Sequence, residues 1–275
     1  GSRGILKYEV RCRQNTEHTK EVPAMADHYN HYPLKHFAAT VAGCMDMTLP
    51  EPFAPPVDWA ADILKKRLGG PADRVVLYHA DAVGMYIWQK YTQMFASVYE
   101  HTSLNIPFSS TIMPVTPVAH ASMYTGLLPK HHGISAYVRP KLSCSTLYDE
   151  LIAQGKKIAV VCQDDSSFCR IFAERDMDYF VLAAGAREIQ EKALELIASD
   201  KYDLISVHSY DYDTASHANG PESPAALEKL AIEVDGFDRI CKALKEFEGK
   251  HRILFSYSPD HGQHLVPGGS GDHGL

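Results

Sequence analysis

Short apolar runs alternate with longer amphipathic segments along most of this chain. The apolar runs have the length and composition of buried strands, whereas the longer segments repeat their apolar positions with helical spacing. We predict strands at residues 74–79, 108–113, 157–162, 179–183, 203–208 and 252–257, and helices at residues 59–68, 84–100, from 116 onward, 145–154, 167–174, 187–198 and 224–247. Strands separated by helices predict an α/β fold with a mostly parallel central sheet and helices on both faces.

The first seventy residues follow a different pattern. Up to about residue 50 they are polar and poorly periodic, and a proline-rich loop then leads into one amphipathic helix that ends at Gly69-Gly70-Pro71. The first four residues resemble a cloning remnant, so we expect the natural start to be hidden. We predict an N-terminal segment at residues 1–70, partly tag-derived or irregular with one helix, and a main domain at residues 71–275.

Composition and charge exclude several classes of protein. The 275 residues carry a formal net charge of −7 without any run of Lys or Arg, which argues against a nucleic-acid or anionic-membrane binder. The six cysteines show no CxxC spacing, so we expect reduced thiols and a cytoplasmic location. No segment is long and apolar enough to span a bilayer. If the substrate is an anion, its attraction must be local, most simply from metal ions.

Polar side chains follow several predicted strands at the point where each strand ends. In a parallel sheet, ligands bind beyond the carboxyl ends of the strands, so these side chains are expected to meet. Thr116, followed by Pro117, is also expected to be the N-cap of a helix whose positive end attracts an anion. Nitrogen and carboxylate oxygen without thiolate are the ligands of zinc or another first-row ion in a catalytic site. Seven candidates divide naturally between two ions: Asp81, Thr116, Asp213, His217, Asp260, His261 and His273.

Each of these residues also has an ordinary structural interpretation. An aspartate after a strand, such as Asp81, is often a helix cap, and a threonine before a proline, such as Thr116, is often only a helix cap as well. Asp213 and His217 fit a surface pair on one helical turn, and Asp260-His261-Gly262 fits a polar turn. The joint order and placement of the residues is what favours a site.

The same residues resemble a known family. Thr116 with His120, the run Thr125–Pro129 and the run His132–Ile134 are similar to the nucleophile region of the alkaline phosphatase superfamily, in its type I phosphodiesterase/nucleotide pyrophosphatase branch. Residues 213–221, with Ser216 in place of a glycine, match a second motif of that branch, and residues 260–262 with 273–274 match the last. The resemblance covers residues 74–275.

The resemblance implies an alkaline-phosphatase-like core and a metal-dependent phosphodiesterase-like catalytic domain at residues 71–275. It implies one zinc ion held by Asp81, Thr116, Asp260 and His261, and a second held by Asp213, His217 and His273. The implied reaction is hydrolysis of phosphate diesters or nucleotide pyrophosphate bonds in a small-molecule phosphate ester, through a phosphothreonine at Thr116.

Two departures from the family pattern leave other functions open. Ala119 replaces an asparagine common in the family, and the segment between Asp260 and His273 is short. A phosphomonoesterase or phosphomutase of the same superfamily is therefore an alternative, and a non-catalytic metal-binding protein is another. A sulfatase is not supported, because Thr116-Pro117-Val118-Ala119-His120 lacks the required Cys or Ser context.

Overall fold

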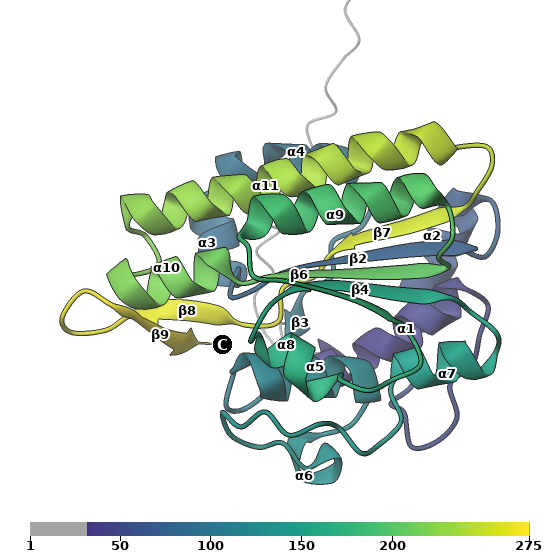
Figure 1. Ribbon diagram of the computed structural model, residues 1–275, viewed down its shortest axis with the longest axis horizontal. Coiled ribbons are helices and arrows are strands. Elements are labelled where there is room, and N and C mark those ends of the chain that lie inside the picture. The colour runs from purple at the N-terminus through teal and green to yellow at the C-terminus, as the bar shows by residue number, and fades with distance from the viewer. Residues whose placement is uncertain (1–31, 275) are drawn as a thin grey trace, which may run out of the picture.

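A five-stranded parallel sheet forms the centre of the computed structural model, which describes residues 32–274 (Figure 1). The strand order is β5-β4-β6-β2-β7, and all neighbouring strands run parallel. The strands are β2 (Arg74–Ala80), β4 (Ile158–Gln163), β5 (Asp178–Leu182), β6 (Leu204–Ser209) and β7 (Ile253–Tyr257). The prediction of an α/β fold with a mostly parallel central sheet is confirmed.

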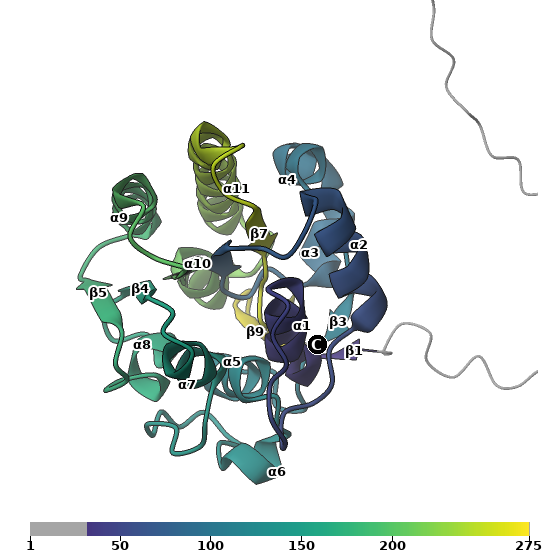
Figure 2. The same ribbon diagram turned by 90° about the vertical axis from the view of Figure 1, so that its right-hand side faces the viewer.

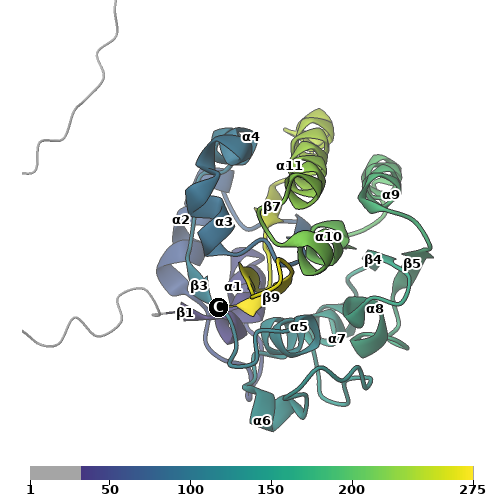
Figure 3. The same ribbon diagram turned by 90° about the vertical axis from the view of Figure 1, so that its left-hand side faces the viewer.

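Helices cover both faces of this sheet (Figures 2 and 3). One face carries α3 (Met85–Lys90), α4 (Ala96–His101), α9 (Ala186–Ser199), α10 (Asp211–Asn219) and α11 (Pro224–Leu244). The other carries α1 (Phe37–Cys44), α5 (Thr116–Thr125), α7 (Leu147–Ala153) and α8 (Ser167–Ile171), with α2 (Asp58–Leu68) packed on α1. Alternate residues of β2 enter the two cores: Val75 and Leu77 pack on one side, and Val76 and Tyr78 on the other.

The remaining elements are short. Strands β1 (Tyr32–Pro33) and β3 (Phe108–Ser109) pair in parallel, and β8 (Gly262–Leu265) and β9 (Gly271–Gly274) form an antiparallel hairpin. A single turn of helix, α6 (Pro129–His132), follows α5, and 3-10 turns lie at Leu34–His36, Thr92–Phe95 and Lys245–Phe247. The predicted strand at 108–113 is thus only two residues long and lies outside the central sheet.

The predicted helix at 84–100 is broken. Tyr91, with φ −113° and ψ 37°, ends α3, and a 3-10 turn separates it from α4. Trp88 and Phe95 then pack ring against ring across the break, with centroids 4.3 Å apart. Aromatic packing has outweighed helical continuity here.

The N-terminal segment contains a helix that the sequence pattern did not predict. Helix α1 packs against α5, and Leu34, Phe37 and Val41 share the hydrophobic core formed by the strands. The predicted helix at 59–68 is present as α2. None of the helices within residues 32–274 is long and apolar enough to cross a membrane. The cysteines in that range, Cys44, Cys144, Cys162, Cys169 and Cys241, are free, and Cys12 lies outside it.

Candidate active site

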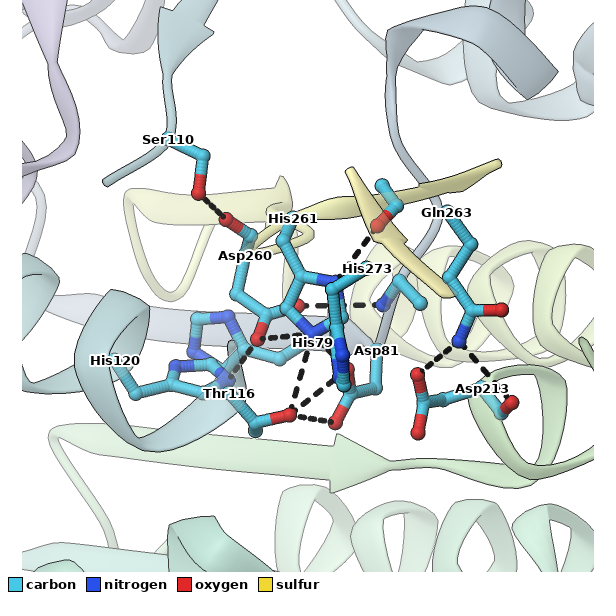
Figure 4. A network of polar contacts seen from close by, with 12 residues as sticks. His79, Asp81, Ser110, Thr116, His120, Asp213, Asp260, His261, Gln263 and His273 are labelled. Carbon is cyan, nitrogen blue, oxygen red and sulfur yellow. Dashed lines mark hydrogen bonds and ion pairs between the residues drawn. The ribbon is translucent and has the colours of Figure 1, made fainter. Parts of the chain in front are cut away.

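The seven predicted site residues come together at the carboxyl edge of the sheet. All of them except His217 are labelled in Figure 4. Their positions follow from the connections that leave the strands. Asp81 directly follows β2, and Asp260 and His261 follow β7. Thr116 opens α5, while α10, which begins two residues after β6, carries Asp213 and His217, and His273 returns on β9.

The first group consists of Asp81, Asp260 and His261, whose candidate ligand atoms all lie within 4.8 Å of one another. Asp81 Oδ1 is 3.1 Å from His261 Nε2, and Asp260 Oδ2 is 3.5 Å from the same nitrogen. Thr116 Oγ1 completes the group, because it lies 3.2 Å from both Asp81 Oδ2 and His261 Nε2. All four side chains are buried.

Thr116 is the first residue of α5, so the prediction that it is the N-cap was wrong. Val115 occupies that position, and no side chain caps the helix. The Thr116 hydroxyl donates instead to Asp81. Pro117 lies in the first turn as expected. The positive end of the α5 dipole therefore still lies at the Thr116 hydroxyl.

The second group consists of Asp213, His261 and His273, again within 4.8 Å. His217 joins it through its Nε2, which lies 3.4 Å from Asp213 Oδ1 and 3.3 Å from His273 Nε2. His261 belongs to both geometric groups and therefore lies between them. The two sets of metal ligands predicted from the sequence therefore lie next to each other.

The β8-β9 hairpin orients His217. His217 Nδ1 donates to the Gly271 carbonyl at 3.1 Å, which directs Nε2 toward Asp213 and His273. Gly271 allows the hairpin to lie close to α10, because a Cβ at this position would lie only 2.6 Å from the Ser216 carbonyl oxygen on α10. His261 is oriented in the same manner, with Nδ1 donating to the Gly262 carbonyl at 3.0 Å.

Two buried carboxylates, Asp81 and Asp260, and the half-buried carboxylate of Asp213 lie close together in this site, which shifts their pKa values. Burial, and then the charge of Asp81, raise the pKa of Asp213 to about 8 and that of Asp260 to about 6. Burial also opposes the charge on His261, but Asp260 and Asp81 outweigh it and raise that pKa to about 10. For Asp81 itself, hydrogen bonds from His208 and His261 overcome burial and hold the pKa well below its usual range.

The donor set fits divalent cations. Asp260 Oδ2 is buried without a hydrogen-bond partner, and a cation would satisfy it. Carboxylate oxygens, imidazole nitrogens and one hydroxyl, without thiolate, are suited to zinc or a similar ion. A pair of cations would also offset the repulsion among the three carboxylates.

Two polar residues around the site were not predicted. Gln263 donates through Nε2 to Asp213 Oδ1 at 2.5 Å, and His208 Nε2 lies 3.2 Å from Asp81 Oδ2. Gln263 follows His261 by two residues, and this closeness in sequence could have predicted that Gln263 lies at the site. His208 lies one residue before the end of β6, and only the pairing of β6 with β2 brings it to Asp81.

Residues 85–273 match the family model described as type I phosphodiesterase / nucleotide pyrophosphatase. The chain belongs to this family. The membership confirms the resemblance to the phosphodiesterase branch, whose members are hydrolases. A search among curated proteins gives no match.

Solved structures share the fold of this phosphodiesterase-family chain at low sequence identity. Murine ectonucleotide pyrophosphatase/phosphodiesterase 5, in an inactive variant with AMP, is 13% identical with a TM-score of 0.59, covering 71% of this chain and 59% of that one. The human protein of the same name is 16% identical with a TM-score of 0.56, covering 70% and 58%. The chain thus spans less than two thirds of the length of these structures.

Proposed function

We propose that this chain hydrolyses phosphate diesters or nucleotide pyrophosphate bonds at a two-metal site, with Thr116 as the nucleophile. The observation that carries the proposal is the position of Thr116 Oγ1, 3.2 Å from both Asp81 Oδ2 and His261 Nε2. A threonine hydroxyl in such a setting, at the positive end of a helix, is placed to react with an anionic phosphorus centre.

The two metal ions would be held by the residues that the geometry groups together. Asp81, Thr116, Asp260 and His261 would hold one, and Asp213, His217 and His273 the other. Zinc is the metal that this donor set favours. When bound, the ions lower the pKa of the threonine hydroxyl and offset charge on the phosphate and the leaving oxygen.

The reaction then consists of two successive displacements at phosphorus, the first by Thr116 and the second by water. Thr116 Oγ1 gives up its proton to solvent and forms a bond to phosphorus as the bond to the leaving oxygen breaks, and the leaving oxygen takes up a proton from solvent. Water next attacks the same phosphorus, breaks the Oγ1–phosphorus bond and returns a proton to Thr116. Two in-line displacements predict retention of configuration at phosphorus.

The comparisons support the substrate class. The murine structure is described as an inactive variant, with one threonine changed to alanine, in complex with AMP. An essential threonine and a nucleotide ligand in a protein of the same fold are what the proposal expects. The substrate of this chain would accordingly be a small nucleotide-related phosphate ester.

A direct test compares a diester with a monoester. The chelated protein is reconstituted with zinc and assayed with bis-p-nitrophenyl phosphate and with p-nitrophenyl phosphate. Faster turnover of the diester supports the proposal, whereas faster turnover of the monoester would favour a phosphomonoesterase or phosphomutase. Absence of turnover of either ester with any divalent ion would indicate a non-catalytic metal-binding protein.

The monoester alternative has one observation in its favour. The residues between Asp260 and His273 form only the β8-β9 hairpin, so this part of the site contains no additional substrate-binding segment. A monoester needs fewer contacts beyond the reacting phosphate than a diester does.

A further inference from the structure

His208 is a buried histidine that contacts the site but lies outside both candidate ligand sets. It lies one residue before the end of β6, where it pairs in register with His79 of β2 and Cys162 of β4. Its side chain has no exposure to solvent. A buried polar ring needs a partner, and the contacts of His208 show which one it has.

The partner of His208 is the carboxylate of Asp81. Nε2 lies 3.2 Å from Asp81 Oδ2, the same oxygen that accepts the Thr116 hydroxyl at 3.2 Å. A carboxylate oxygen accepts hydrogen bonds, so Nε2 is the ring atom that carries the hydrogen in this contact. Nδ1 is buried without any partner, which is consistent with a bare lone pair at that atom.

The ring of His208 has little freedom to move. Phe168 stacks on it with centroids 4.8 Å apart and planes 10° from parallel. His120 packs edge-on from another direction at 5.2 Å. Both neighbours fix the direction of the Nε2–H bond, and hence the orientation of the carboxylate that accepts it.

We propose that His208 is a positioning residue, which holds Asp81 Oδ2 so that Oδ1 is directed into the first ligand group. Oδ1 lies 3.1 Å from His261 Nε2 and would be the ligand atom. The inference rests on the proposed metal site. Hydrogen bonds of this kind to a ligand typically change metal affinity by about 10- to 100-fold when they are removed.

The test measures zinc affinity by competition with a chromophoric chelator. His208→Leu removes the donor, and we expect affinity for one of the two ions to fall by about 10- to 100-fold. His208→Gln retains an N–H group at a similar distance and should restore an affinity close to wild type. His132→Leu is the matched control, because His132 is also buried but hydrogen-bonds to Ser122 and Ile134.

Two results would overturn the positioning role. One is a His208→Leu variant that binds both ions as tightly as wild type. The other is the loss of one whole ion in both His208 variants, since that would make His208 a ligand itself. Thermal unfolding of each variant checks that the fold is intact.

A second measurement does not depend on metal. A ¹H–¹⁵N correlation spectrum of the metal-free protein should show the His208 hydrogen on Nε2, and a hydrogen on Nδ1 would overturn the inference. Failure of the wild-type protein to bind any divalent ion would instead contradict the proposed function. The two failures are therefore distinguishable.

Discussion

A buried carboxyl behind the site makes folding stability depend on pH. Glu233 lies on α11 with no exposure to solvent, where it accepts hydrogen bonds from Tyr78 Oη and Ser209 Oγ, each at 2.6 Å. Burial raises its pKa from 4.5 to about 7, although both hydrogen bonds favour the ionised form. Glu233 is therefore protonated more readily in the folded chain than in the unfolded one.

The sign and size of the effect follow from linkage. A carboxyl whose pKa is raised on folding costs little below its unfolded pKa, and its cost grows as the pH rises toward the folded pKa. With the two values above, this group destabilises the fold by roughly 2–3 kcal/mol more at about pH 8 than at about pH 5. Glu233→Gln has the shape of the protonated carboxyl and does not ionise, so it should abolish this pH-dependent term.

The assay is denaturant unfolding of wild type and Glu233→Gln across this pH range. We expect the stability of the variant relative to wild type to rise by roughly 2–3 kcal/mol between about pH 5 and about pH 8. Glu228→Gln, an exposed position on the same helix, should show no such change relative to wild type. Parallel pH curves for wild type and Glu233→Gln would refute the reasoning.

Other substitutions test separate parts of the structure. Thr116→Ala should abolish turnover while zinc content, measured by elemental analysis, stays largely intact, and wild-type rates would refute the nucleophile assignment. Asp260→Asn should lower zinc content and activity together, and normal occupancy of both ions would count against it as a ligand. Gly236→Ala should cost about 1–3 kcal/mol in chemical unfolding, because its Cβ would lie 2.1 Å from Gln190 Nε2. Gly43→Ala is its control, since the nearest atom there is 3.4 Å away.

The central sheet could be predicted because its signal is local. Apolar runs such as the one preceding Asp81 mark buried strands, and helical spacing marks the segments between them. Asp81 and Asp260 could be placed at strand ends for the same reason, and the parallel arrangement then brought them together. Strand order could not be obtained in this way, because it depends on contacts between segments far apart in the chain.

The sequence did not predict the features of the structure that leave no periodic pattern of apolar residues. Seven residues of the eight in α1, from Phe37 to Cys44, are buried, so the helix has no polar face to reveal it. His208 was read only as the end of a strand, since its contact with Asp81 depends on β6 lying beside β2. The N-cap was placed one residue late, at Thr116, because the Thr116 hydroxyl bonds to Asp81 in the site and not to the helix end. The division at residue 70 and the cytoplasmic location stay predictions.

The proposed reaction requires two groups of side chains, each of which holds a cation next to Thr116. The most direct measurement is anomalous X-ray diffraction at the zinc edge from crystals grown with zinc. We predict one peak contacted by Asp81, Thr116, Asp260 and His261, and a second contacted by Asp213, His217 and His273. A map without zinc at these residues, or with Thr116 out of contact with any ion, would contradict the account.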